Sequence, residues 1–127
     1  MGPQYLIDTN VVIDFFNGRL PINGQRLLTA IVPAISVITH IELFSKARLS
    51  PAETAQLQQF VQVATVYDTI TPDIIAQTIA LRVQHKIKTP DAIIAATALA
   101  YNLELITRNL SDFRAIQGLK LIDPHSL

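Results

Sequence analysis

Predicted strands and helices alternate along the whole chain, and this alternation limits the fold more than any other feature of the sequence. Runs of apolar and β-branched residues predict strands at 5–7, 34–37, 65–67, 103–106 and 119–122. Helices are expected between them, at 11–16, 25–31, around Glu42, at 51–63, from Thr71 and from Thr89. Such alternation favours an α/β fold with a mostly parallel sheet covered by helices on both faces.

Proline and hydroxyl side chains mark several of the helix starts. Ser50-Pro51-Ala52-Glu53 combines an N-cap serine, a proline at the first helical position and a glutamate at the third. Thr71-Pro72-Asp73 starts a helix with Ile75, Ile79 and Val83 at helical spacing, and Thr89-Pro90-Asp91 opens the next helix in the same way. Thr39 is expected to cap the helix that carries Glu42.

Length and composition restrict the class of protein further. The 127 residues are one domain's worth of sequence, so we expect a single domain over 1–127. Half of the residues are hydrophobic and 16% are charged, which excludes a disordered chain. Without cysteine there is no disulfide, thiolate metal site or cysteine nucleophile. Ten basic and ten acidic residues balance, which excludes a nucleic-acid binder that relies on overall positive charge.

The sequence carries no signal for export or for a membrane span. The first apolar run has no basic segment before it and is interrupted by Asp8 and Asp14. The longest uncharged apolar stretch, 92–101, is far too short to cross a bilayer. We therefore expect a soluble, cytoplasmic protein.

Four acidic residues occupy positions where a parallel α/β fold places ligands, near the carboxyl ends of strands. Asp8 ends the first strand, Glu42 lies on an apolar helix, Asp91 is in the first turn of a helix, and Asp112 follows the fourth strand. Carboxylates gathered in one crevice repel one another, and a hard divalent cation is the usual resolution. An oxygen-only ligand set favours Mg²⁺ or Mn²⁺ over Zn²⁺, and hydrolysis of phosphate esters is typical of such sites.

Each of these acids also has a purely structural interpretation. Asp8 is a suitable turn residue after a strand, and Asp91 stabilises a helix dipole without any further role. Asp112 fits a local cap, and Glu42 can reach water from an amphipathic helix. Spacing alone therefore suggests a metal site without establishing one. The remaining acids are interpreted as structural or surface residues: Asp14, Glu53, Asp68, Asp73, Glu104 and Asp123.

A local group of basic residues offers phosphate contacts although the chain is neutral. Arg82, His85, Lys86 and Lys88 follow one another without an intervening acid. Arg82 and Lys86 are explained equally by the dipole at a helix C-terminus. Lys88 lies three residues before Asp91, and Arg108 lies four before Asp112, so we expect these two cations to contact substrate phosphates.

The acidic motifs, taken in order, resemble a known family. The segments 5–11 (YLIDTNV) and 38–43 (ITHIEL) look like the opening half of a PIN domain. The segment 88–98 (KTPDAIIAATA) resembles its third acidic motif, and 105–113 (LITRNLSDF) resembles its last. The four motifs span nearly the whole chain, and they look in particular like those of the VapC toxins of toxin–antitoxin pairs.

This resemblance implies a Mg²⁺- or Mn²⁺-dependent endoribonuclease with a Rossmann-like five-stranded sheet in the order 3-2-1-4-5. It assigns the metal-binding and catalytic roles to Asp8, Glu42, Asp91 and Asp112. It also implies a homodimer and a VapB-type antitoxin whose tail blocks the active site.

The resemblance also identifies residues around the metal ligands. Relatives place the fourth acid at the position of either Asn109 or Asp112, so Asn109 is a ligand or a hydrogen-bond partner. Asn10 and Thr107 are expected to orient carboxylates or water.

The expected reaction is hydrolysis of an RNA phosphodiester, which leaves a 5′-phosphate and a 3′-hydroxyl. Two other classes remain open at this point. One is a PIN-type binding or scaffold module that keeps the acids without catalysis. The other is a phosphoacceptor receiver-like domain, which needs a pair of acids after the first strand, whereas Asp8 is followed by Thr9.

Overall fold

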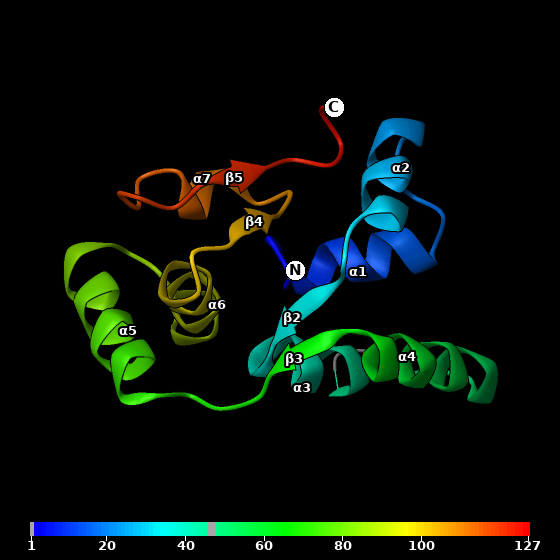
Figure 1. The fold of residues 1–127 in the computed structure, drawn as a ribbon, viewed down its shortest axis with the longest axis horizontal. Helices are drawn as coiled ribbons and strands as arrows, with labels where there is room; N and C mark the ends of the chain where they lie inside the picture. The colour runs from blue at the N-terminus through cyan, green and yellow to red at the C-terminus, as the bar shows by residue number, and fades with distance from the viewer. Residues whose placement is uncertain (1, 46–47) are drawn as a thin grey trace.

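The computed structural model describes residues 2–45 and 48–127, which form an α/β sandwich (Figure 1). The strands are β1 (Tyr5–Ile7), β2 (Ala34–Ser36), β3 (Thr65–Tyr67), β4 (Glu104–Ile106) and β5 (Leu121–Ile122). The helices are α1 (Thr9–Phe16), α2 (Ile22–Ala30), α3 (Val37–Ser45), α4 (Pro51–Val63), α5 (Pro72–Gln84), α6 (Thr89–Ala100) and α7 (Leu110–Phe113). Every strand predicted from the sequence is present, and the α/β class is confirmed.

All strand pairs are parallel, but the hydrogen-bonded order corrects the predicted single sheet. Among the described residues, one ladder joins β1, β4 and β5 in that order, and a second ladder joins β2 and β3. Strands β1 and β2 lie in contact between the two ladders. Leu6 of β1 and Ala34 of β2 belong to one apolar core, and Ile7 and Ile35 belong to another, so apolar packing joins the two ladders.

Two apolar cores cover the two faces of the strands, because successive side chains of a strand point to opposite faces. Leu6 and Leu105 are paired across β1 and β4 and pack with α5 and α6 in one core. Ile7 and Ile106 are the next pair and pack with α1, α3 and α4 in the other core. The chain therefore has helices on both faces of a parallel sheet, as the alternation of its elements predicts (Figure 1).

The helix caps confirm two of the predicted starts and correct two others. Ser50 and Glu53 form the complete capping box, and Thr71 accepts a hydrogen bond from the backbone N–H of Ile74. Helix α3 starts earlier than predicted, and its cap is Ser36, whose Oγ accepts from the backbone N–H of Thr39. Helix α6 begins at Thr89 itself and has no side-chain cap, and the Thr89 hydroxyl accepts a hydrogen bond of 2.6 Å from Arg82.

Helix α5 has an apolar face on each side. Its buried face consists of Ile74, Thr78 and Leu81. The residues whose spacing predicted the helix, Ile75, Ile79 and Val83, are 49%, 60% and 81% exposed. We call these three residues the α5 ridge. Helix α5 lies at the outer edge of the molecule, with α6 between it and the strands (Figure 1).

The chain after β5 returns to α1 and α2 and is fixed there by polar and steric contacts. His125 Nε2 lies 3.0 Å from Asp14 Oδ2, and the Asp14 side chain is only 2% exposed. Gly24 of α2 lies so close to the backbone of Pro124 that any side chain at position 24 would collide with it. Within the described part of the chain, no helix is long and apolar enough to cross a membrane.

Candidate metal and nucleic-acid site

The carboxyl ends of the strands meet at one edge of the molecule, and polar side chains follow them there. Asp8 comes directly after β1, and Thr107 comes directly after β4. A pocket of about 300 Å³ opens at this edge. It is lined by the residue after β1 and by residues from α1, α3, the start of α6 and the loop after β4: Asp8, Thr9, Asn10, Glu42, Lys88, Pro90, Asp91 and Asn109.

Asp8 is buried at the base of this pocket and is held by donors from two directions. Its Oδ1 accepts a hydrogen bond of 2.8 Å from the backbone N–H of Thr9, because Asp8 is the N-cap of α1. Its Oδ2 accepts a hydrogen bond of 2.8 Å from the Thr107 hydroxyl. Donors to both oxygens stabilise the ionised form and fix the orientation of the carboxylate.

Glu42 reaches the pocket from the second turn of α3. Its Oε1 accepts a hydrogen bond of 2.7 Å from the hydroxyl of Thr9, which is itself 2.9 Å from the hydroxyl of Thr39. Sequence reasoning treated Thr39 as a helix cap and assigned neither Thr9 nor Thr39 to the site. The available signal was the polar spacing Ser36, Thr39, Glu42, which places three polar side chains on one side of a helix start.

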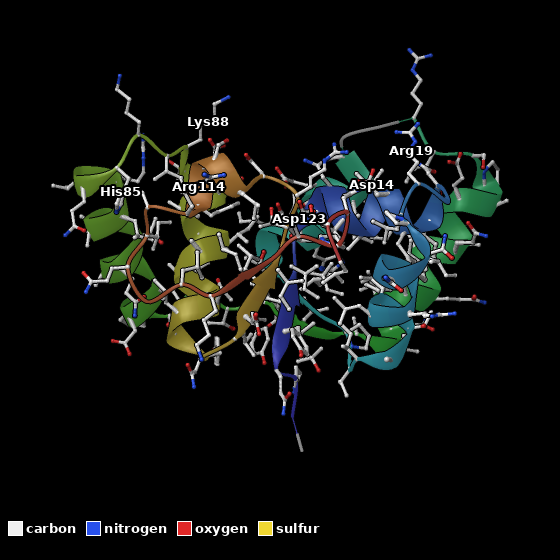
Figure 2. The ribbon with its side chains drawn as sticks, turned by 90° about the horizontal axis from the view of Figure 1, so that it is seen from above. Asp14, Arg19, His85, Lys88, Arg114 and Asp123 are labelled. Atoms are coloured by element: carbon white, nitrogen blue, oxygen red, sulfur yellow. The ribbon has the colours of Figure 1, made fainter. Side chains whose placement is uncertain are left out.

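Asp91 and Lys88 bring opposite charges to the other wall of the pocket. Asp91 is half-buried in the first turn of α6, where the helix dipole favours a negative charge. Lys88 is the residue before α6, and its side chain extends outward at the edge of the molecule (Figure 2). An ammonium at the rim of an acidic pocket is suited to contact an anionic substrate.

The structure separates the two candidates for the fourth acidic position. Asn109 lines the pocket, whereas Asp112 is exposed outside its lining. Asp112 Oδ2 accepts a hydrogen bond of 2.7 Å from Asn109 Nδ2, and the backbone N–H of Asn109 donates to the Thr107 hydroxyl. Asp112 is thus connected to the pocket through the Asn109 amide.

Arg108 is directed away from the pocket, toward α1. Its Nη1 lies 3.0 Å from Oδ2 of Asp14, and its side chain is 47% exposed. Asp14 therefore binds two basic side chains, Arg108 and His125, and joins the loop after β4 to the end of the chain. Asp14 and Asp123 are labelled in Figure 2, which shows this side of the molecule.

The oxygen donors of the pocket fit a hydrated divalent cation better than a bare one. Within the described ranges, no three acidic or histidine side chains are gathered closely enough to enclose a metal ion. Mg²⁺ is commonly held by one or two carboxylates while it keeps several water molecules, and these waters span wider separations. Asp8, Glu42 and Asp91, with the Asn109 amide, supply hard oxygen atoms around a pocket large enough for such an ion.

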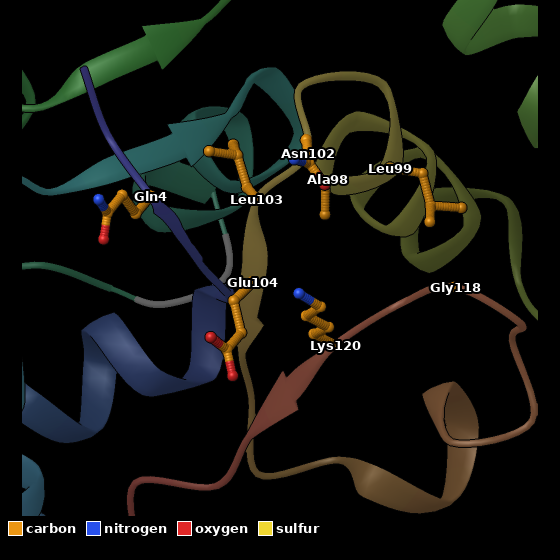
Figure 3. A pocket seen from close by; sticks show the side chains of 8 residues that line it. All are labelled: Gln4, Ala98, Leu99, Asn102, Leu103, Glu104, Gly118 and Lys120. Atoms are coloured by element: carbon orange, nitrogen blue, oxygen red, sulfur yellow. The ribbon is translucent and has the colours of Figure 1, made fainter. Parts of the chain in front are cut away.

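A second pocket lies at the opposite, amino-terminal edge of the strands (Figure 3). It has a volume of about 290 Å³ and includes the amides of Gln4 and Asn102. Glu104 at the start of β4 supplies a carboxylate, and Lys120, the residue before β5, supplies an ammonium. With a single carboxylate beside a cation, this pocket lacks the acidic oxygens that a divalent cation needs.

The fold and the acidic pocket define a parallel α/β protein with a candidate ligand site at the strand ends. The chain matches the family model of the PIN domain over residues 5–119 and belongs to that family. The resemblance inferred from the motifs is thereby confirmed, and the receiver-like alternative is excluded. Among curated protein sequences no significant match was found.

Solved structures of toxin–antitoxin complexes contain chains with the same fold. A chain of a toxin–antitoxin complex from Klebsiella pneumoniae is 36% identical, with a TM-score of 0.79 and coverage of 97% of this chain and 99% of that one. A chain of VapBC2 from Rickettsia felis bound to promoter DNA is 27% identical, with a TM-score of 0.77 and coverage of 93% of this chain and 96% of that one. DNA-bound VapBC from Salmonella typhimurium shares the fold with 24% identity, a TM-score of 0.81 and coverage of 96% and 98%.

Proposed function

We propose that this protein is a metal-dependent endoribonuclease and the toxin of a VapBC-type toxin–antitoxin pair. The observation that carries the proposal is the meeting of Asp8, Glu42 and Asp91 in one pocket at the carboxyl ends of the strands. Membership in the PIN-domain family and the similarity to chains of toxin–antitoxin complexes support it. We expect the protein to act in the cytoplasm, where its RNA substrate is found.

In this proposal Asp8 and Asp91 hold the principal Mg²⁺ or Mn²⁺, and Glu42 and Asn109 complete its surroundings, with Asp112 acting through Asn109. When bound, the cation supplies an activated water and neutralises charge that develops on the phosphate. Asp8 is fixed by two hydrogen bonds and presents its oxygens without reorganisation.

The other polar groups of the pocket act on the nucleophile and the substrate. Glu42 is positioned to accept a proton from the attacking water. Lys88 is positioned at the rim to bind a phosphate of the RNA, and Asn10 orients water inside the pocket. Attack of water on phosphorus breaks the bond to the 3′-oxygen, which leaves with a proton, so the products are a 3′-hydroxyl and a 5′-phosphate.

A second copy of the chain and an antitoxin are the expected protein partners. The α5 ridge supports a homodimer, because it is an exposed apolar face on one helix. If two copies of α5 pack antiparallel about Ile79, Asp73 of one copy lies opposite His85 of the other, next to Lys86, so the charges at the two ends are complementary. The toxin–antitoxin complexes among the similar structures support a VapB-type antitoxin.

RNA cleavage tests the proposal against a scaffold module that keeps the acids without catalysis. Purified protein is incubated with total RNA in Mg²⁺, in Mn²⁺ and in EDTA, and the product ends are identified by ligation. The proposal predicts cleavage in either metal, none in EDTA, and products whose 5′-phosphate permits ligation. Binding of RNA without cleavage in both metals would favour the scaffold module.

A further inference from the structure

A chain of buried hydroxyl groups lies directly beneath the Glu42 carboxylate. The Thr9 hydroxyl is 2.7 Å from Glu42 Oε1 and 2.9 Å from the Thr39 hydroxyl. The Thr39 hydroxyl is in turn 3.5 Å from that of Ser36. Ser36, Thr39 and Thr9 are fully buried, with at most 1% exposure, whereas Glu42 is half-buried and lines the pocket.

The chemistry of these groups gives the hydrogen bonds a single direction. An ionised carboxylate only accepts, so the Thr9 proton is directed to Glu42. The Thr9 oxygen then accepts from Thr39, and the Thr39 oxygen accepts the longer bond from Ser36, whose own oxygen already accepts from the Thr39 backbone N–H. In such a chain each bond polarises the next, so the bond to the carboxylate is strengthened.

Thr9 also contacts the second acid of the pocket through its backbone. Its N–H donates to Asp8 Oδ1, while its hydroxyl donates to Glu42 Oε1. One residue at the start of α1 therefore holds a carboxylate that follows β1 and another that lies on α3. Thr9 thus links the two carboxylates directly, one through its backbone and the other through its side chain.

We propose that Thr9 is a positioning residue that sets the placement of the Glu42 carboxylate relative to Asp8, and that Thr39 and Ser36 fix the Thr9 hydroxyl. The catalytic consequence of this placement rests on the proposed nuclease function. The placement itself does not, because it is a property of the protein without metal or RNA.

Replacing Thr9 with valine or serine separates this role from simple packing. Thr9→Val keeps the size, the branching and the backbone N–H to Asp8 but removes the hydroxyl, whereas Thr9→Ser keeps the hydroxyl and loses a methyl group. Crystal structures of the metal-free variants give the first measurement. We expect the Glu42 carboxylate to move away from Asp8 in Thr9→Val and to stay in place in Thr9→Ser.

Metal binding and kinetics give the second measurement. Groups that orient metal ligands typically contribute about 10- to 100-fold in affinity, so Thr9→Val should weaken Mn²⁺ binding by roughly that factor. Its kcat should fall while its KM for RNA stays nearly constant, and Thr9→Ser should remain close to the wild type in both. Thr39→Val, which removes the donor to Thr9, should give a smaller loss in the same direction.

The outcomes distinguish this inference from the proposed function. An unmoved Glu42 carboxylate in Thr9→Val, or equal damage in Thr9→Ser and Thr9→Val, would overturn the positioning role. If Thr9→Val does not fold, the same measurements on Thr39→Val decide. Failure of the wild type to cleave RNA would overturn the nuclease function, yet the position of Glu42 in the metal-free variants would still test Thr9.

Discussion

The Thr107 hydroxyl donates a hydrogen bond of 2.8 Å to Asp8 Oδ2, although 99 residues separate the two in the sequence. The contact follows from the register of the sheet. Ile7 is paired with Ile106 at the ends of the parallel strands β1 and β4, so the next residue of each strand meets the other. Asp8 and Thr107 are both buried, and the backbone N–H of Asp8 also donates to the carbonyl of Ile106.

Thr107→Val should destabilise the protein and weaken its metal site together. The substitution keeps the shape of the side chain but removes a donor from a buried carboxylate, which costs about 1–3 kcal/mol. Urea unfolding measures the loss of stability, and Mn²⁺ titration measures the loss of affinity. Thr107→Ser is the matched control and should retain both. Unchanged stability and affinity in Thr107→Val would show that the hydrogen bond has no role.

Asn109 and Asp112 should differ in how they tolerate substitution. Asn109→Ala removes a pocket-lining amide and should lower the cleavage rate strongly. Asp112→Asn keeps an oxygen that accepts from Asn109 Nδ2, so its effect should be small, whereas Asp112→Ala should resemble a mild form of Asn109→Ala. Single-turnover cleavage rates check the order. If Asp112→Asn abolishes cleavage and Asn109→Ala does not, Asp112 contacts the metal or the substrate itself.

Lys88 and Arg108 should have different effects, although the sequence suggested the same role for both. Lys88→Ala removes a cation at the pocket rim and should reduce the slope of log affinity for RNA against log salt by about 1. Arg108→Ala breaks the pair with buried Asp14 and should mainly lower stability, by about 1 kcal/mol because Arg108 is half-exposed. RNA binding at several salt concentrations and urea unfolding separate the two. If Arg108→Ala reduces the slope of log affinity against log salt as much as Lys88→Ala does, Arg108 also contacts the RNA.

Ile79→Glu should convert a dimer into a monomer. A charge placed in the centre of an apolar interface costs several kcal/mol, so the dimer dissociation constant should rise by roughly 100-fold or more. Sedimentation equilibrium measures the constant. Val63→Glu is the control, because Val63 is also exposed but lies on α4. A wild-type protein that is monomeric at high concentration, or an Ile79→Glu variant that remains dimeric, would show that the α5 ridge is not a dimer interface.

Local sequence patterns predicted the elements well, because the relevant forces act over a few residues. The triplets of β1 and β3 are β-branched, aromatic or apolar, and the Ser50–Glu53 capping box is complete within four positions. In that box the Ser50 backbone N–H and hydroxyl lower the pKa of Glu53, so its contribution to stability is present at neutral pH and is lost as the pH falls below the carboxyl range.

Features that depend on distant partners could not be predicted in this way. Thr89 is followed by the proline and aspartate that are typical of a helix start. Its hydroxyl nevertheless accepts a hydrogen bond from Arg82 on the preceding helix and does not cap α6. The spacing of Ile75 and Ile79 identified α5 correctly but not the face that it buries, because Ile74 and Leu81 form a second apolar face. The sequence placed Asp8, Glu42 and Asp91 near strand ends, yet the bond between Thr9 and Glu42 joins residues 33 positions apart.

Calorimetric titration with Mn²⁺ tests most directly whether these strand ends form a site for a divalent cation. The titration is carried out on the wild type and on Asp8→Asn. Asp8→Asn keeps the size of the side chain, and circular dichroism confirms that the variant is folded. We expect the wild type to bind Mn²⁺ and Asp8→Asn to lose this binding. A folded wild type that binds no Mn²⁺, or an Asp8→Asn variant that binds it equally well, would contradict the claim.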